Sequence, residues 1–321
     1  MCSSDLAPSA PVAVIDIGSN SIKALVARRG ADGGLEEVDS RAIDARIGAG
    51  ISRERPQLSE EGMTRGLDAV RQLAAGCAAR GASQLIIVAT SAVRDAGNGA
   101  DFRERVRAAT GVDLRILTGD EEAALIGRGL LSDPALRERT DFTVCDLGGG
   151  SLECVAFDGR RVRAEVSLPL GCVRLTERFI PDPSAPVPPD ALAAVSTHVR
   201  AALGTSVFTF HPPAAPELVG TGGTISTARR IIGRREGLRS EASNPVLSLA
   251  TLRGLLVEVS ALPLARRGEI PGLAVARADV FPAALATVIA VLEYAGAGAF
   301  RHSMRNLRHG LASEALAILT R

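Results

Sequence analysis

Apolar residues in the first part of the chain fall in short runs that predict β-strands. One run ends at Ile17, just before Gly18, and the next extends from Ile22 to Ala27. A glycine-rich turn at 30–34 then leads into a third strand-like stretch, Leu35 to Ala42. Short apolar runs bounded by such turns are typical of strands joined as hairpins. The predicted order is strand, glycine turn, strand, hairpin turn, strand.

The same pattern recurs in the second part of the chain. The segment Val14 to Ser21 reappears as Val144 to Ser151, with Val, Asp, Gly and Ser identical and two further apolar positions alike in character. A run from Leu152 to Phe157, a turn at 158–160 and an alternating stretch from Val162 to Leu168 follow. Repetition of a whole supersecondary unit indicates a duplicated fold.

Helical patterns follow both hairpins. Ser59 to Ala79 predicts a helix, because Glu60 and Glu61 fall in its first turn, where acidic residues are favourable. Elements expected further along are strands at Leu85 to Ala89, Leu114 to Leu117 and Glu217 to Val219, and helices near Asp101 to Ala109, Pro189 to Leu203, Leu249 to Val259, Val280 to Tyr294 and Leu307 to Leu319. The proline-rich stretches at 181–189 and 212–216 are expected to be loops.

These elements predict an α/β chain of two domains, 12–131 and 132–321, with the boundary near residues 131–141. In each domain an antiparallel hairpin is expected to lie on a mixed sheet. The final helix, at about 307–319, is expected to pack back on the first domain.

The composition of the chain limits its class of ligand and the compartment in which we expect it. The chain has 321 residues, 46% of them hydrophobic, which is enough for two cores of ordinary size. Its 37 basic and 36 acidic residues give a net charge of +1, which argues against a general nucleic-acid binder. Five cysteines without a C-x-x-C pair fit a reducing compartment. With no leader pattern and no long apolar run, we expect a soluble, cytoplasmic protein with no membrane partner.

The two glycine turns indicate a ligand. Each preceding strand ends in Asp-x-Gly, and two small or polar residues and a serine follow. Glycine allows a tight turn whose N–H groups point at an anion, and the serine hydroxyl adds a donor. Two such loops facing each other across a cleft would clamp a phosphoanhydride from both sides. The phosphate-binding residues predicted from these loops are Gly18, Ser19, Asn20, Ser21, Gly148, Gly149, Gly150 and Ser151.

Further motifs resemble those of known proteins. The paired loops, together with Gly220 to Thr224 entering a helix, resemble the superfamily of actin, heat-shock chaperones and sugar kinases. This resemblance implies the two-domain actin-like ATPase fold, of the ribonuclease H-like type, with phosphate also bound by Gly222, Gly223 and Thr224. Five motifs in order resemble the exopolyphosphatase and guanosine pentaphosphate phosphatase family, namely Asp16 to Ser21, Ala89 to Ala96, Leu117 to Ala123, Asp146 to Glu153 and Pro169 to Arg174.

The chain departs from the family pattern in two places. The chain resembles a short form without the helical C-terminal region with which longer members help to hold long polyphosphate, so limited processivity on long chains is expected. His309 stands where the family more often has an acid.

A capping box places two acids at the start of a helix. Thr118 and Glu121 have the Thr-x-x-Glu spacing, so Glu122 is expected in the first helical turn. By resemblance, Glu122 is the catalytic glutamate that activates water; the alternative is that both glutamates only favour the helix dipole. Arg94 follows a strand and could reach a phosphate through two hydrogen bonds, although a surface role is also open.

Acidic residues beside the loops are candidate metal ligands, since one or two carboxylates with substrate phosphates are typical of Mg²⁺ sites. Glu153 lies in an apolar run, where a carboxylate is costly unless it is paired or metal-bound. The resemblance agrees and makes Asp146 and Glu153 ligands of Mg²⁺, with Mn²⁺ as a substitute. Asp16 either joins a metal site or braces its hairpin. Lys23, expected by alternation on the same side as Ser21, is a candidate helper for binding the substrate phosphate.

The expected function is an exopolyphosphatase that releases orthophosphate from the ends of inorganic polyphosphate. The same residues would serve a guanosine pentaphosphate 5′-phosphatase. A small-molecule kinase of the same superfamily is less favoured, because the first loop is Gly18-Ser19-Asn20-Ser21 and not the Gly-Gly-Thr type of sugar kinases. A non-catalytic nucleotide-binding sensor is a further alternative, against which Glu122, Asp146 and Glu153 argue. A homodimer is left open.

Overall fold

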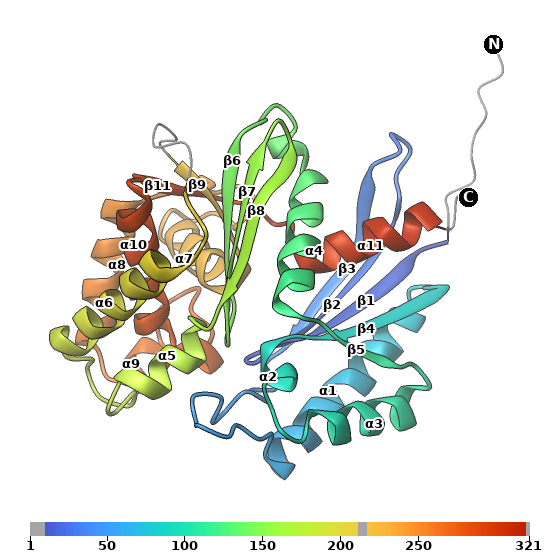
Figure 1. The fold of residues 1–321 in the computed structure, drawn as a ribbon, viewed down its shortest axis with the longest axis horizontal. Coiled ribbons are helices and arrows are strands. Elements are labelled where there is room, and N and C mark those ends of the chain that lie inside the picture. The colour runs from blue at the N-terminus through green and yellow to red at the C-terminus, as the bar shows by residue number, and fades with distance from the viewer. Residues whose placement is uncertain (1–9, 211–216, 319–321) are drawn as a thin grey trace. The chain divides into compact units, whose positions relative to one another are not determined.

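A computed structural model describes residues 10–210 and 217–318; the loop predicted at 212–216 lies outside them. The chain forms two compact units, each with its own sheet (Figure 1). Unit 1 contains the residues up to Ala49, Arg55–Pro134 and those from Arg305 onward. Unit 2 contains Ala135–Met304 and a short segment, Gly50–Glu54, that interrupts unit 1 in the sequence.

Unit 1 is built on a five-stranded mixed sheet of order β3-β2-β1-β4-β5. Its strands are β1 (Val12–Ile17), β2 (Ile22–Arg29), β3 (Leu35–Ile43), β4 (Gln84–Ala89) and β5 (Leu114–Ile116). The first three strands pair antiparallel, and β4 and β5 extend the sheet in parallel.

Helices cover both faces of this sheet. Those on one face are α1 (Glu60–Ala78) and α3 (Gly99–Thr110), and those on the other are α4 (Gly119–Leu131) and α11 (Leu307–Ile318) (Figure 1). A one-turn helix, α2 (Ser91–Arg94), follows β4. Coverage on both faces explains why β1 is an almost continuous apolar run and is buried along nearly its whole length.

Unit 2 is built on a six-stranded mixed sheet of order β10-β11-β9-β6-β7-β8. Its strands are β6 (Phe142–Leu147), β7 (Leu152–Asp158), β8 (Arg161–Leu168), β9 (Glu217–Thr221), β10 (Val246–Ser248) and β11 (Ala299–His302). Its helices are α5 (Cys172–Phe179), α6 (Pro189–Thr205), α7 (Gly222–Arg235), α8 (Leu249–Ala261), α9 (Leu264–Arg267) and α10 (Phe281–Ala295). α10 forms the centre of the helical layer, because every residue from Phe281 to Leu292 is buried and the helix packs against α5, α6 and α8.

The sequence repeat is also a structural repeat. In both units the first three strands form an antiparallel meander, and the first strand also pairs in parallel with a later strand of the chain. The register between the second and third strands shifts between Val26 and Ala27 in one copy and between Ala156 and Phe157 in the other. These positions are equivalent in the repeat, and such irregularities are specific features of a strand pair. The predicted α/β fold with two mixed sheets and a duplicated hairpin is therefore confirmed.

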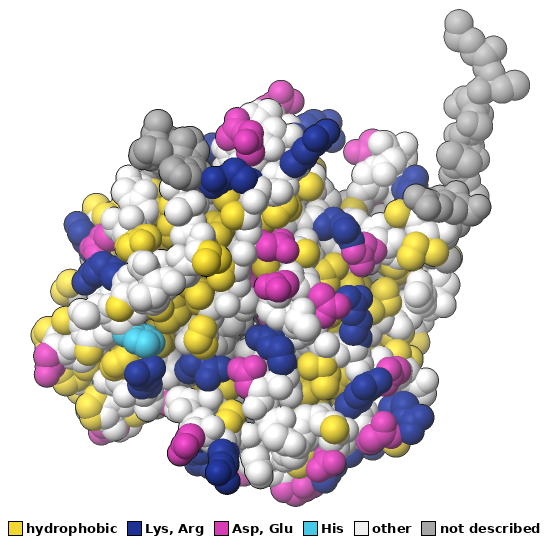
Figure 2. Space-filling view, in the orientation of Figure 1, with side chains coloured by type: hydrophobic (Ala, Val, Ile, Leu, Met, Phe, Trp, Pro, Cys, Tyr) yellow, Lys and Arg dark blue, Asp and Glu magenta, His cyan; other side chains and the backbone are white. Residues whose placement is uncertain are grey.

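Charged side chains of both signs are mixed on the face of the protein drawn in Figure 2, in keeping with the net charge of +1. Within the described part of the chain, every helix is too short or too polar to cross a bilayer.

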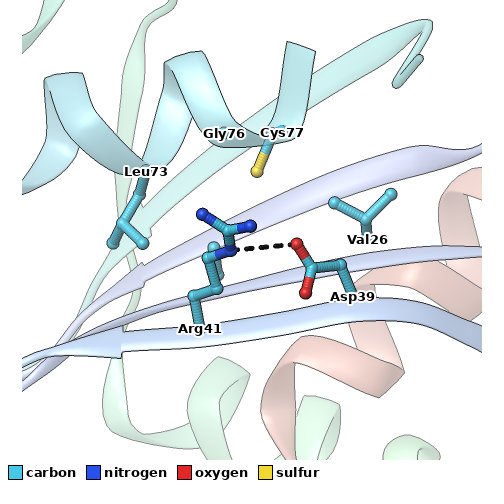
Figure 3. A pocket seen from close by; sticks show the side chains of 7 residues that line it. Val26, Asp39, Arg41, Leu73, Gly76 and Cys77 are labelled. Carbon is cyan, nitrogen blue, oxygen red and sulfur yellow. Dashed lines mark hydrogen bonds and ion pairs between the residues drawn. The ribbon is translucent and has the colours of Figure 1, made fainter. Parts of the chain in front are cut away.

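A small pocket lies between α1 and the strands β2 and β3 (Figure 3). Its volume is about 10 Å³, roughly the space of one water molecule. Arg41 donates to Asp39 at 3.0 Å at its edge, and burial, together with the nearby Asp39 charge, raises the pKa of the Cys77 thiol. The pocket is lined by none of the residues predicted to bind phosphate or metal.

Candidate active site

Backbone N–H groups at the N-terminus of α5 bind the second glycine loop, Gly148–Ser151. The Gly148 N–H donates to the Ser151 carbonyl at 3.0 Å, which closes the turn. The carbonyls of Gly148 and Gly149 accept hydrogen bonds from the N–H groups of Cys172, at 3.0 Å, and Val173, at 2.8 Å. Because N–H and C=O point in opposite directions across a planar trans peptide, the loop N–H groups of these peptides point away from α5. That is the orientation an anion-binding loop needs.

Glycine 171 makes this support possible. A Cβ atom at Gly171 would overlap the backbone of Gly149 and Gly150, so a larger residue would push α5 off the loop. The motif Pro169 to Arg174 thus has a physical role, because it packs against the second loop and binds its backbone.

The first loop, Gly18–Ser21, is held in the same way by a different element. Its turn is closed by the Gly18 N–H donating to the Ser21 carbonyl at 3.2 Å. The Ser19 carbonyl accepts from the Gly48 N–H at 2.8 Å, and the Asn20 carbonyl accepts from the Arg46 N–H at 2.9 Å. The segment that follows β3 therefore supports loop 1 as the segment that follows β8 supports loop 2. This support was not predicted, because it arises from backbone bonds that leave no motif in the sequence.

Buried polar atoms in unit 1 support a ligand at the first loop. Asn20 is buried, yet neither its side-chain oxygen nor its nitrogen has a hydrogen-bond partner among the residues that the structure describes, and the same is true of Asp16 Oδ1. Buried polar atoms are almost always paired, and unpaired ones point to an unseen partner such as an ion or bound ligand. Ser19 Oγ lies 3.3 Å from Ser91 Oγ, so loop 1 contacts the start of α2.

The predicted catalytic glutamate is buried at the start of α4. The capping box is confirmed, because Thr118 Oγ1 accepts from the Glu121 N–H at 3.2 Å and the Glu121 carboxylate accepts from the Thr118 N–H at 2.8 Å. This cap fixes the first turn, in which Glu122 is 7% exposed. Arg94 Nη1 donates to Glu122 Oε2 at 3.0 Å and to the Leu117 carbonyl at 3.0 Å. The structure thus brings Arg94 and Glu122 together within unit 1.

The predicted metal ligands Asp146 and Glu153 face each other across β6 and β7. They are directly paired in the antiparallel register, which puts both side chains on one face of the sheet. Glu153 is 2% exposed and accepts a hydrogen bond from Ser167 Oγ at 2.7 Å. Carboxylate oxygens are the ligands that Mg²⁺ prefers, and one or two carboxylates are its usual protein contribution.

The equivalent pair in unit 1 has a different charge. There Asp16 is directly opposite Lys23, so the carboxylate already faces a cation. Burial raises the pKa of Asp16, whereas the charges of Lys23 and Arg308 lower it. The donor set therefore fits a divalent cation at Asp146 and Glu153 in unit 2. At Asp16 the facing Lys23 and the unpaired Oδ1 point in different directions, so its role as a metal ligand or as a brace of the hairpin stays a prediction.

Two carboxylates are a sufficient protein contribution for Mg²⁺, which usually keeps several waters and shares ligands with substrate phosphates. The described residues contain no group of three or more His, Cys, Asp or Glu side chains placed to hold an ion by themselves. In a site of this kind, water and substrate phosphates would supply the remaining ligands.

The third predicted glycine segment lies at the N-terminus of α7. Gly222 has φ +87°, and a Cβ atom there would overlap the Asp146 carboxylate. A Cβ atom at Gly223 would overlap the guanidinium of Arg277, which lies on η2, the 3-10 helix Val275–Arg277. Thr224 is buried beside them in the first turn of α7. The sequence did not single out Arg277, because it lies far downstream in an arginine-rich chain.

The predicted residues therefore form one cluster in each unit. Unit 1 joins loop 1 to Ser91 and, through α2, to Arg94 and Glu122. Unit 2 joins loop 2, Asp146, Glu153 and the N-terminus of α7. The cleft expected between the two loops stays a prediction.

Two units that each begin with an Asp-x-Gly hairpin on a mixed sheet define the actin-like ATPase fold, as predicted. Within that fold class, the chain belongs to the Ppx/GppA phosphatase family, whose model matches residues 25–317.

Relatives with known names or structures agree with this assignment. An exopolyphosphatase from Cytophaga hutchinsonii superposes with a TM-score of 0.84 at 25% identity, covering 96% of this chain and 98% of that one. A Ppx/GppA family member from Aquifex aeolicus gives a TM-score of 0.77 at 26% identity with the same coverage. A guanosine-5′-triphosphate,3′-diphosphate pyrophosphatase of Vibrio atlanticus (strain LGP32) is 29% identical over 304 residues. Those residues are 94% of this chain but only 58% of that relative.

Proposed function

We propose that this phosphatase is an exopolyphosphatase that removes terminal phosphates from inorganic polyphosphate. The observation that carries the proposal is the pair of facing carboxylates, Asp146 and Glu153, beside a loop whose backbone N–H groups are directed outward. Two carboxylates on one face are a donor set that suits Mg²⁺, and a divalent cation beside a phosphate loop is what phosphoanhydride hydrolysis uses. The similar length and high TM-score of the Cytophaga exopolyphosphatase support polyphosphate as the substrate.

The residues of the chain have distinct roles in this proposal. The loop N–H groups, with Ser21 and Ser151, bind the phosphate oxygens, and Arg277 and the N-terminus of α7 add positive charge. Asp146 and Glu153 would hold Mg²⁺, which when bound neutralises charge on the phosphate oxygens. Glu122 accepts a proton from the attacking water, and Arg94 holds its carboxylate in place. The water oxygen bonds to the terminal phosphorus, the bridging P–O bond breaks, and orthophosphate leaves a chain one unit shorter.

Guanosine pentaphosphate is the second candidate substrate, because the Vibrio relative is named for it. Its guanine would require a stacking or hydrogen-bonding surface. The chain has one tyrosine, no tryptophan and only 3% aromatic residues in all, so it offers few rings for stacking a base, although arginine side chains could substitute. This composition favours the substrate without a base.

A comparison of substrates tests the proposal. Purified protein is incubated with Mg²⁺ and, separately, medium-chain polyphosphate, guanosine pentaphosphate and ATP, and released orthophosphate is measured. We expect kcat/KM for polyphosphate to exceed that for either nucleotide at least about tenfold, a difference of about 1.4 kcal/mol in transition-state binding. Faster release from guanosine pentaphosphate would favour the second candidate. No release from any of the three would favour a non-catalytic sensor.

Removal of the metal should abolish turnover, and its binding should be visible without turnover. We expect a chelator to stop phosphate release and Mg²⁺ or Mn²⁺ to restore it. We also expect saturating Mg²⁺ to stabilise the wild-type protein, by about 2.7 kcal/mol at one hundred times the Kd, and to raise its Tm. Glu153→Gln should lose this shift, whereas Ser167→Ala, which removes a hydrogen bond but no charge, should keep most of it. Full turnover in chelator would show that the carboxylates have another role.

A further inference from the structure

We propose that Arg174 is a positioning residue that holds the second phosphate loop in its anion-binding orientation; the proposal rests on the function proposed above. Arg174 lies in the first turn of α5, immediately after Cys172 and Val173, and its own N–H also donates to the Gly149 carbonyl, at 3.4 Å. Its Nε donates to the Gly150 carbonyl at 3.0 Å. With this bond, the carbonyls of Gly148, Gly149 and Gly150 are all bound by α5.

The side-chain bond has a role that the backbone bonds cannot fill. The peptide between Gly150 and Ser151 carries the N–H nearest to the Ser151 hydroxyl, and Arg174 Nε binds its carbonyl. Glycine peptides rotate more freely than others, so this peptide needs an anchor to keep its N–H directed at a ligand. A guanidinium supplies that anchor with fixed geometry, because its donors form a rigid planar fork.

The same guanidinium reaches a second segment. Arg174 Nη1 donates to the Ile51 carbonyl at 2.9 Å, so one side chain bridges Gly150 and the segment Gly50–Glu54. That segment is itself fixed by Glu177, one turn further along α5. The Glu177 carboxylate accepts from the Gly50 N–H at 2.6 Å, from the Ser52 N–H at 3.1 Å and from Ser52 Oγ at 2.8 Å.

These contacts make the orientation of the loop dependent on the segment Gly50–Glu54. Arg174 is held between two backbone carbonyls, one in the loop and one in a segment that Glu177 immobilises. Weakening the Glu177 contacts would let the Ile51 carbonyl move and would leave Arg174 less constrained. We therefore expect Arg174 substitutions to have the larger effect and Glu177→Gln a smaller effect of the same kind.

Arg178 offers a matched control on the same helix. It lies one turn beyond Arg174, its guanidinium is 5.2 Å from the centre of the Phe179 ring, and it is 3.4 Å from His198. Arg178→Gln removes the same charge from α5 without removing a contact described for the loop. Arg174→Gln and Arg174→Lys remove the fork, and the lysine keeps one donor for the Gly150 carbonyl.

The experiment has two independent readouts on the full chain. Hydrogen exchange of the amides of Gly149, Gly150 and Ser151 reports loop order without any turnover. We expect exchange at least about tenfold faster in Arg174→Gln and unchanged in Arg178→Gln. Steady-state kinetics with polyphosphate should show KM raised about tenfold and kcat/KM lowered about a hundredfold in Arg174→Gln, with partial rescue in Arg174→Lys. A mere folding defect would reduce the active fraction, which lowers kcat but leaves KM unchanged.

The two readouts test the positioning role of Arg174 and the proposed function separately. Loop amides that exchange in Arg174→Gln as in the wild type, or that loosen equally in Arg178→Gln, would overturn the positioning role. If the wild-type protein releases phosphate from none of the substrates, the proposed function fails, and the exchange data still decide whether Arg174 orders the loop. Faster loop exchange with a raised KM, confined to Arg174 variants and weaker in Glu177→Gln, would support the proposal.

Discussion

Two adjacent glutamates at the start of α4 have different surroundings. The Glu121 carboxylate accepts the Thr118 N–H and pairs with Arg115 at 2.5 Å. These contacts lower the pKa of Glu121, the backbone bond first and the Arg115 guanidinium second. Glu122 is buried and bound by Arg94. Glu121 therefore caps the helix, whereas Glu122 is buried and held by an arginine.

Substituting each glutamate by glutamine separates these roles. Glu122→Gln should lower kcat for phosphate release by about 10² to 10⁴, because an amide cannot accept the proton of the attacking water. Glu121→Gln should lower the free energy of unfolding by about 0.5–1 kcal/mol through a weaker cap and leave turnover near normal. Steady-state kinetics and urea unfolding of both variants check this. A larger kinetic loss in Glu121→Gln would show that the assignment is off by one residue.

Residues in local motifs could be predicted, and residues brought in from a distance could not. Thr118 and Glu121 stand at the capping-box spacing, so the turn that contains Glu122 follows from four adjacent positions. Arg277 lies at Gly223 only because the chain returns there after several helices. Nothing near Arg277 in the sequence distinguishes it from the other arginines.

At the scale of elements, α4 and α11 make the most extensive helix–helix contact in the described part of unit 1. A Cβ atom at Gly129 would overlap the Asn306 carbonyl, and one at Gly310 would overlap the Leu125 carbonyl. The ion pair of Arg128 with Glu314 adds a further link between the helices. Since Glu122 lies on α4, this crossing helps to fix the position of the proposed base.

An alanine at this crossing should separate the two helices. Gly129→Ala should lower the free energy of unfolding by about 1–3 kcal/mol, because the added methyl group meets backbone that cannot move aside freely. Gly254→Ala is the control, since Gly254 lies within α8 and nothing is within 4 Å of an added Cβ. That substitution should raise stability by up to about 1 kcal/mol through better helix propensity. Equal losses in both variants, measured by urea unfolding, would contradict the close crossing.

Most elements could be predicted because their signals are local. The strands of both hairpins and the long helices have periodic or continuous apolar patterns, and their observed ends differ from the predicted ones by two residues or fewer. The short elements α2, α5, α9, β10 and β11 were not predicted. β10 and β11 have three and four residues, and their pairing is fixed by strands far away in the sequence. Such strands carry too few residues for a periodic pattern.

At the scale of the whole molecule, unit 1 is completed by the end of the chain. α11 packs on the face of the first sheet opposite α1, where Arg308 donates to the Ala24 carbonyl at 2.8 Å and to Ser40 Oγ at 3.2 Å. Unit 2 likewise includes Gly50–Glu54 from the middle of unit 1 in the sequence. The sequence could not predict that Gly50–Glu54 belongs to unit 2, because its contacts with α5 place it there and it has no motif of its own.

His309, in the first turn of α11, couples the stability of this arrangement to pH. Its ring is buried beneath β3, where Nδ1 accepts from the Asn306 N–H at 3.1 Å and Nε2 lies 3.4 Å from Glu37. Burial lowers the pKa of His309 from 6.5 to about 4; the Glu37 bond opposes this shift, and the charges of Arg308 and Arg305 add to it. The native imidazole is thus neutral at pH values where the unfolded one is protonated.

The sign of the pH dependence follows from this difference. Below about pH 6.5 the unfolded chain binds a proton that the native protein does not, so acidification favours unfolding. The slope approaches about 1.4 kcal/mol per pH unit, and roughly 2 kcal/mol should be lost between about pH 7.5 and pH 5. The pKa of Glu37 is lowered by its bond to His309, so the stability that this carboxylate contributes is lost mainly at lower pH.

Substitution of the histidine tests the coupling. His309→Asn keeps an acceptor for the Asn306 N–H but cannot titrate, so its free energy of unfolding should lack this loss over the same pH window even if its stability at pH 7.5 is lower. His198→Asn is the control, because that ring is only partly buried, beside Arg178 and Phe179, and its pKa is lowered mainly by burial. Urea unfolding of the three proteins across the window measures the slopes. Equal slopes in the wild type and His309→Asn would mean that other groups set the acid sensitivity of the fold.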